Sequence, residues 1–285
     1  MSNVQKQSTP EVMEPLADTT SPRRRRWRVS PLVLGLQIAI AVGFVAGWEI
    51  LVRVGLIDAF FFSQPSAIAE RVAQWLSTGE IYDDLFITVQ EAFLALVIGA
   101  VAGLLVGFAL ARVDLLAAVL DPYVKIANAI PRVVLAPIFL LWFGLGIWSK
   151  VAFGVTLVFF IVFFNTYQGV KEVNRVLVDN ARMLGASERQ LIREVFLPSA
   201  LSWIFSSLHV SVGFAIVGAV VGEYLGSSAG IGYVIAQAEG TFDTTGVFAG
   251  IFVLSVVVLI VDVLVNRAER HLLRWRPDPS HSEMA

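Results

Sequence analysis

Long apolar segments separated by short polar ones run through most of the chain. Only 15% of its residues are charged, against about 25% in an ordinary soluble domain, and its mean hydropathy is +0.74. Because a helix needs about 20 apolar residues to cross a bilayer, this pattern predicts an all-α, polytopic membrane protein. Six transmembrane helices are expected, at residues 31–53, 84–110, 126–143, 151–167, 201–224 and 246–265.

Glycines in the second predicted span indicate close helix packing. Gly99, Gly103 and Gly107 recur every fourth residue, so they share one helix face that another membrane helix can approach closely. In the third predicted span, Pro131 and Pro137 indicate a kink. Between the spans we expect an amphipathic helix at 67–76, a polar stretch at 112–125, and a glycine-rich loop with a short helix at 225–245.

The basic residues predict the orientation of the spans. An even number of spans puts both termini on one side, and that side carries most of the arginines and lysines, including Arg23–Arg26. The opposite side holds only Arg53, Arg71 and Lys150. Because cytoplasmic loops are enriched in basic residues, both termini and residues 169–198 are expected in the cytoplasm. The arginine run is interpreted as a positive anchor beside the membrane, with binding of anionic lipid as the alternative.

The domain organisation follows from these assignments. Residues 1–30 are expected to form a disordered cytoplasmic tail, 31–266 the transmembrane domain and 267–285 a cytoplasmic C-terminal tail. Nothing indicates enzyme chemistry, since the chain has no cysteine, three scattered histidines, no G-x-x-x-x-G-K-[ST] phosphate loop and no G-x-S-x-G motif. The sequence therefore predicts no catalytic residue, no metal and no cofactor, and its net charge of −2 does not indicate nucleic-acid binding.

The longest charged stretch between apolar segments, residues 169–198, is typical of a helix–turn–helix. Gly185 suits the left-handed residue that ends a helix, and Ser187 with Gln190 predicts a capping box at the start of the next one. Pro198 suits the first turn of the following segment. The first helix is expected to carry one apolar stripe, made of Val170, Val173, Val176, Leu177 and Leu184.

Polar and ionisable side chains inside the predicted spans are candidates for a transport pathway, because such groups are costly in a membrane. The pathway candidates are Arg132, Ser207, His209, Ser211 and Glu223. Arg132 is positioned either to attract an anion or to pair with Glu91, and Glu223 lies toward the outer gate. For the serines and the histidine the alternative is helix–helix hydrogen bonding, and for Glu91 and Asp262 it is a place at the membrane interface.

The stretch 169–198 resembles the EAA loop of ABC-importer permeases, a cytoplasmic element that docks into a groove on the ATPase subunit. Its motif reads Asp179-Asn180-Ala181, then Gly185, then Leu197-Pro198. The spacing matches, while Asp and Asn replace the Glu and first Ala of the name-giving triplet. The resemblance implies an ATPase-coupling set made of Asp179, Asn180, Ala181, Leu184, Gly185, Ala186 and Ser187.

Further motifs resemble the nitrate/taurine/sulfonate branch of that family, over about residues 60–276: Ile130-Pro131, Leu141–Gly146, Gly222-Glu223 and Gly230–Gly232. Glu91 and Ala95 depart from the branch's pattern. The resemblance implies the type I ABC-importer permease fold in a bacterial inner membrane. It also implies partners, namely a second permease subunit, most simply an identical copy, two ATP-binding ATPase subunits, and a periplasmic binding protein. That protein would deliver a small anionic or heteroaromatic solute.

Two other classes of membrane protein remain open at this point. A secondary transporter or channel would need no ATPase, and such folds often contain internal repeats, which the two halves of this chain do not show. A membrane scaffold would need neither a polar patch in the fifth span nor a kink in the third. Uptake that depends on a separate ATPase would distinguish the importer from both.

Overall fold

The computed structural model describes residues 31–272. The predicted N-terminal tail, 1–30, and residues 273–285 of the predicted C-terminal tail lie outside the described residues. The chain divides into two compact units, 1–47 and 48–285. The described part of the first unit is the beginning of helix α1 (Pro31–Arg53), whose length and apolar sequence suit a membrane span.

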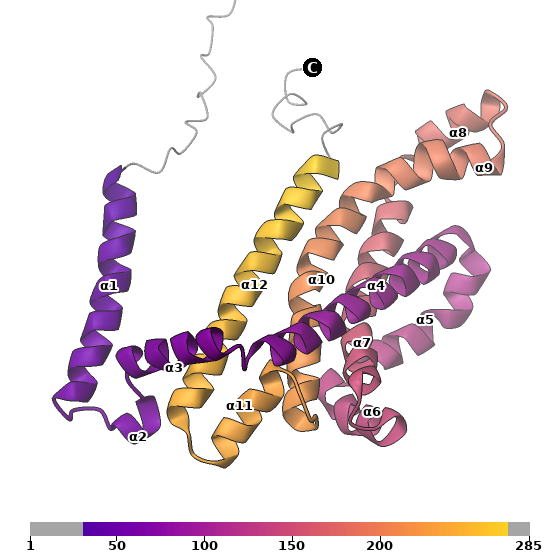
Figure 1. Ribbon diagram of the computed structural model, residues 1–285. Coiled ribbons are helices and arrows are strands. Elements are labelled where there is room, and N and C mark those ends of the chain that lie inside the picture. The colour runs from indigo at the N-terminus through magenta and orange to yellow at the C-terminus, as the bar shows by residue number, and fades with distance from the viewer. Residues whose placement is uncertain (1–30, 273–285) are drawn as a thin grey trace, which may run out of the picture. The chain divides into compact units, whose positions relative to one another are not determined.

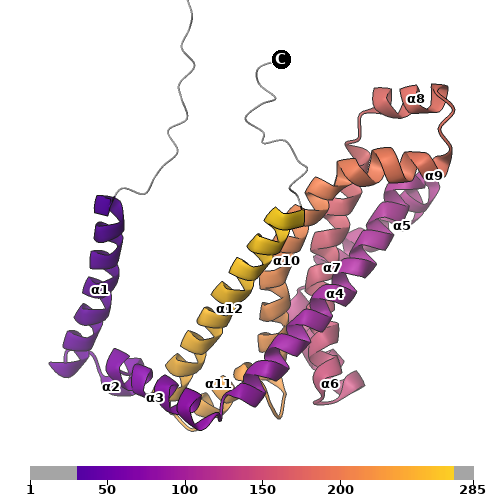
Figure 2. The ribbon, with the colours of Figure 1, turned by 45° about the horizontal axis from the view of Figure 1, so that its top comes forward.

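The second unit consists of helices (Figures 1 and 2), and residues 31–272 contain no strand. After α1 the chain forms α2 (Ala59–Phe62), α3 (Pro65–Thr78), α4 (Tyr82–Arg112), α5 (Asp114–Ala129), a 3-10 turn (Arg132–Leu135), α6 (Ala136–Phe143), α7 (Ile147–Lys171), α8 (Arg175–Met183), α9 (Glu188–Gln190), a π-helical segment (Leu191–Phe196), α10 (Leu197–Leu225), α11 (Ile231–Gly240) and α12 (Thr244–Leu272).

The helices account for the predicted spans. In the described part of the chain, five helices are long and apolar enough to cross a membrane: α1, α4, α7, the continuous helix Glu188–Leu225, and α12. The sixth candidate is a bent pair formed by α5 and the segment Arg132–Phe143. The prediction of an all-α, polytopic chain is confirmed, and six spans result when the bent pair counts as one.

The third span differs from its prediction. Residues 112–125, expected as a polar stretch, are helical from Asp114 onward, because α5 is amphipathic and keeps its charged residues on an exposed face. The chain then bends by 87° before the segment Arg132–Phe143. Pro131 causes the bend, since a proline disfavours helical backbone in the residue before it, and Ile130 is extended with φ −66° and ψ 125°. The predicted kink is confirmed, but the bent pair that forms the third span already begins at Asp114, twelve residues before the predicted start at 126.

Helices α4, α7 and α10 pack side by side and form the core (Figures 1 and 2). Their contact surfaces depend on glycine. A Cβ atom at Gly103 would lie 2.7 Å from the carbonyl oxygen of Phe159 in α7, and one at Gly218 would lie 2.5 Å from the α7 backbone. Gly99 and Gly107 face α7 in the same way, so the predicted close approach along this face of α4 is confirmed.

The end of the bundle opposite α8 and α9 is closed by short helices, as both views show (Figures 1 and 2). The predicted short helices are present here as α3 and α11, which pack against the start of α12. Arg71 on α3 pairs with Asp243, just before α12, at 2.6 Å. The buried apolar residues of this end are Ile68, Trp75, Ile81, Ile231, Ala249 and Val253.

Candidate functional site

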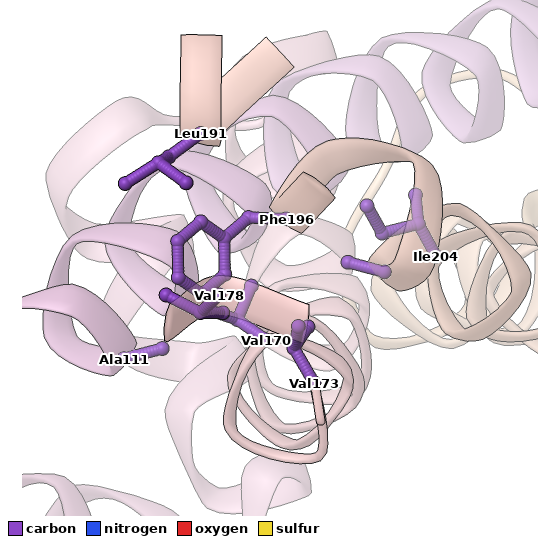
Figure 3. Close-up of a cluster of buried hydrophobic side chains, with 8 residues drawn as sticks. Ala111, Val170, Val173, Val178, Leu191, Phe196 and Ile204 are labelled. Atoms are coloured by element: carbon purple, nitrogen blue, oxygen red, sulfur yellow. The ribbon is translucent and has the colours of Figure 1, made fainter. Parts of the chain in front are cut away.

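Residues 169–198 form a protruding loop, here called the coupling loop, whose base is fixed by a buried apolar cluster (Figure 3). The cluster joins the end of α4, the end of α7, α8 and the helix that leads into α10. The cluster therefore connects the loop to the ends of three spans. The cluster consists of Ala111, Val170, Val173, Val178, Leu191, Phe196, Ala200 and Ile204.

Local sequence signals shape the turn of the coupling loop as predicted. Gly185 has a φ of +84°, the left-handed region that favours glycine. Ser187 and Gln190 form the predicted capping box at the start of α9. Pro198 lies in the first turn of α10, also as predicted, but the helix is continuous from Glu188 to Leu225 through the π-helical segment.

The prediction of one apolar stripe over residues 170–184 is wrong. The helix α7 ends at Lys171, and a new helix, α8, begins after Asn174, whose side-chain oxygen accepts a hydrogen bond of 2.9 Å from the Val176 N–H. This break changes the helical phase. Val170 and Val173 are consequently buried in the cluster, whereas the apolar residues beyond the break are divided between a buried and an exposed face.

Charged side chains brace the coupling loop from outside. Arg112, the last residue of α4, pairs with Glu188, and its guanidinium lies 4.1 Å from the ring centroid of Phe196. Glu188 also pairs with Arg182 at 3.2 Å, so one carboxylate joins both helices of the loop to α4. Because these pairs are exposed, their main effect is to orient the loop rather than to stabilise the fold.

The tip of the coupling loop exposes apolar side chains that nothing in the described chain covers. Leu184 is 88% exposed and Met183 81%. Val176 and Leu177 on α8 are exposed as well. Of the residues assigned to ATPase coupling, Asp179, Asn180, Gly185 and Ser187 are also exposed, while Ala181 and Ala186 are half-buried against the cluster. An exposed apolar tip on a fixed base is the arrangement expected of a docking element.

The structure does not bring the five pathway candidates into one site. His209 on α10 lies 3.6 Å from Asp262 on α12. Ser207 is buried and donates a hydrogen bond to the Ile204 carbonyl of its own helix, and Ser211 is buried in the packing of α10. The predicted pairing of Arg132 with Glu91 is wrong, because Arg132 instead bonds to groups at the end of α5.

Glu223 belongs to a buried polar cluster that the sequence does not predict. This cluster, here called the carboxyl cluster, brings together Glu223 of α10, Glu91 and Thr88 of α4, and Lys150 of α7, all at most 1% exposed. Glu223 accepts hydrogen bonds from the Thr88 hydroxyl and the Gly232 N–H, both of 2.7 Å. The Glu91 side chain reaches that of Glu223, and Lys150 interacts electrostatically with both carboxyl groups.

The carboxyl cluster holds the start of α11 in place. The Ile231 N–H donates to the Thr88 hydroxyl at 2.9 Å, and the Gly230 N–H donates to Asp84 at 2.6 Å. A Cβ atom at Gly230, where φ is +106°, would lie 2.3 Å from the Glu223 carboxyl group. The glycines of Gly230-Ile231-Gly232 therefore allow the backbone to approach the carboxylate, and α4, α10 and α11 are joined at this end of the bundle.

Comparison with known proteins places the chain in a family. Residues 95–274 match the model of the binding-protein-dependent transport system inner membrane component. The chain belongs to this family, and it is accordingly a multi-pass membrane permease subunit of an ATP-binding-cassette importer. Such a permease works with an ATPase and a substrate-binding protein. This membership decides against the secondary transporter, the channel and the scaffold.

Individual relatives agree with the family. The chain is 34% identical to the putative aliphatic sulfonates transport permease SsuC of Bacillus subtilis, over 81% of this chain and 84% of the relative. It is 36% identical to the formylaminopyrimidine transport permease ThiX of Halalkalibacterium halodurans, over 77% of this chain and 90% of that relative. A solved structure of the inward-facing MetNI methionine ABC transporter matches with a TM-score of 0.55 at 19% identity, covering 70% of this chain and 97% of that one. The last likeness supports the type I importer fold.

Proposed function

We propose that this chain, as one of two identical subunits, forms the pathway by which a small anionic or heteroaromatic solute crosses the inner membrane. A periplasmic binding protein delivers the solute, and an ATPase subunit receives the coupling loop of each permease. The exposed apolar tip around Leu184 carries this proposal, because a permease needs a surface by which ATP-driven motion reaches its spans. The solute class is inferred from relatives named for sulfonates, taurine and formylaminopyrimidine.

The proposed orientation places the coupling loop and both termini in the cytoplasm. The end of α12 lies toward the same end of the bundle as α8 and α9 in both views (Figures 1 and 2), which supports a common side for the loop and the C-terminal segment. The basic residues beside them favour the cytoplasm. The run Arg23–Arg26 is proposed as a positive anchor beside the membrane, with binding of anionic membrane lipid as the alternative. The family describes a transport component, so we propose no catalytic role for the chain itself.

Replacing Leu184 by aspartate is expected to release the ATPase. An 88% exposed leucine that becomes buried on docking contributes about 1.5–3 kcal/mol, and a buried unpaired carboxylate would oppose docking further. Co-purification in detergent of the permease with the ATPase candidates of its own cell should therefore fall at least tenfold. Leu115→Asp is the matched control, because Leu115 is also exposed at this end of the bundle but lies outside the coupling loop. Undiminished co-purification of Leu184→Asp would contradict the docking role.

Replacing Gly185 by aspartate is expected to uncouple ATP hydrolysis from transport without preventing insertion. A Cβ atom there meets nothing within 4 Å, so the harm comes from the φ of +84°, which glycine adopts without cost and a residue with a side chain adopts with strain that changes the angle between α8 and α9. In proteoliposomes with ATPase and binding protein, transport should fall several-fold more than ATPase activity. Gly79→Asp places a side chain at a similar φ of +81° in the turn after α3, at the other end of the bundle, and should not separate the two rates.

A further inference from the structure

A cavity of about 440 Å³ lies beside the break in the third span, among α5, the 3-10 turn, α7 and α10. Its polar lining residues are Asn128, Arg132 and Asn165, and its aromatic ones are Phe160, Phe164 and Phe214. A second cavity of similar volume follows along α7 toward the coupling loop, and both are lined by Phe164 and Asn165. This volume is within the range of small-molecule sites in proteins.

Arg132 is held rigidly at the edge of this cavity. Its Nη1 donates to the carbonyl oxygens of Asn128 at 2.8 Å and Ile130 at 2.7 Å, and its Nη2 donates to the Asn128 side chain at 2.7 Å. These carbonyls lie at the end of α5, where Pro131 interrupts the helix. The guanidinium also lies 4.5 Å from the ring centroid of Phe160. The bend thus fixes both the position and the plane of the guanidinium.

The bonds of Arg132 leave part of its binding capacity unused. A guanidinium has five N–H groups, and the three hydrogen bonds to Asn128 and Ile130 occupy only some of them within residues 31–272. Its partners in this part of the chain are neutral, so the positive charge has no carboxylate beside it. An arginine charge within a membrane protein is costly unless an anion or water accompanies it. The arrangement therefore fits an anion that enters from the cavity.

We infer that this cavity is a binding site for the solute during its passage, and that the solute is a small organic anion with a flat apolar body. Arg132 binds the anionic group, a sulfonate or carboxylate, through its planar fork. The rings of Phe160 and Phe164 contact the body of the solute. The inference rests on the proposed function and narrows it, because it assigns a charge preference to the permease itself rather than to the binding protein alone.

Direct binding to the purified permease in nanodiscs of zwitterionic lipid tests this site without the ATPase. The probes are benzenesulfonate and its neutral relative benzenesulfonamide, followed by saturation-transfer NMR titration. We expect saturable binding of benzenesulfonate that weakens at least tenfold in Arg132→Gln, and only partly in Arg132→Lys, which keeps the charge but lacks the fork. Binding of benzenesulfonamide should be weak and insensitive to both substitutions.

Two further variants keep the test decisive. Lys125→Gln removes another cation, on the preceding helix α5, that pairs with Asp121 on the exposed face, and should leave binding unchanged. Phe160→Leu retains Arg132 and should lower the affinity for benzenesulfonate more than that for methanesulfonate. This variant still tests the site if Arg132→Gln does not fold. Equal binding of benzenesulfonate and benzenesulfonamide, or no effect of Arg132→Gln and Phe160→Leu, would overturn the inference. The Leu184 and Gly185 experiments do not depend on Arg132, so failure here leaves the proposed function standing.

Discussion

Replacing Glu223 by alanine is expected to unfold the end of the bundle that carries α3 and α11 and to prevent assembly of an active transporter. The substitution removes the acceptor of two hydrogen bonds, from the Thr88 hydroxyl and the Gly232 N–H. It also removes one of the two carboxyl groups that interact with Lys150, which is 0% exposed. A buried donor left without an acceptor, such as the Gly232 N–H, costs about 1–3 kcal/mol, an appreciable part of the stability of an ordinary domain.

Thermal unfolding of the purified permease in detergent measures this loss. Glu239→Ala is the matched control, because Glu239 lies on α11 close by but is exposed, and its side chain bonds only to Tyr224 within the described residues. An accessibility assay adds a local readout: the chain has no cysteine, so a single cysteine at Ile231, which is 0% exposed, reports on release of α11. Suppose that Glu223→Ala is as stable as Glu239→Ala and that the cysteine of Ile231→Cys stays protected from labelling. The carboxyl cluster would then not stabilise this end of the bundle.

Glu91 provides a contrast within the same cluster. Two buried carboxyl groups lie near one lysine, whose ammonium group donates to the carbonyl oxygens of Leu145 and Gly146, so a second full negative charge would be poorly compensated. Glu91→Gln keeps the shape of the side chain and removes the second ionisable carboxyl group. We expect the unfolding midpoint of this variant to remain close to that of the natural chain. The two glutamates differ because their contacts differ. Glu223 accepts a hydrogen bond from the α11 backbone, whereas one side-chain oxygen of Glu91 accepts no hydrogen bond from any group in residues 31–272.

This cluster also shows where prediction from sequence ends. Hydropathy identifies the spans, because each span can be recognised from the apolar composition of its own residues. Gly185 and the Ser187–Gln190 capping box are equally local, and both are confirmed. The partners of Glu223 lie on α4, α7 and α11, and no periodicity along the chain indicates which of them meet. From the sequence, Lys150 is predicted to lie in a loop on the side opposite the termini. In the structure, the packing of α7 against α10 buries it.

The third span and the coupling loop show the same limit at shorter range. Pro131 predicts a bend, but the 87° angle depends on how α6 packs against α7. In the coupling loop the apolar spacing suggests one continuous stripe, whereas Asn174 starts a new helix and changes the phase. A cap of this kind is visible in the sequence only as an asparagine among other polar residues. The pathway candidates remain predictions, because the structure does not bring them into one site.

Replacing Gly103 by leucine is expected to separate α4 from α7 and to abolish folding of the permease. The new Cβ atom would lie 2.7 Å from the carbonyl oxygen of Phe159 and 3.0 Å from the backbone nitrogen of Phe163. Both obstacles are backbone atoms of a membrane helix, so no change of side-chain rotamer relieves them. Since membrane helices associate through close packing rather than through the hydrophobic effect, the lost contact has no ready substitute.

A graded series tests this expectation. Gly103→Ala adds only the clashing Cβ atom and should cost about 1–3 kcal/mol, as overpacking of a core does, whereas Gly103→Leu should yield little monodisperse protein by size-exclusion chromatography. Gly43→Leu is the control, because a Cβ atom at Gly43 of α1 meets nothing within 4 Å. Normal yield and unfolding midpoint for Gly103→Leu would mean that α4 and α7 do not pack through this face. Because this face supports the helix that carries Thr88 and Glu91, its loss should also expose a cysteine at Ile231, which connects the packing of the core to the carboxyl cluster.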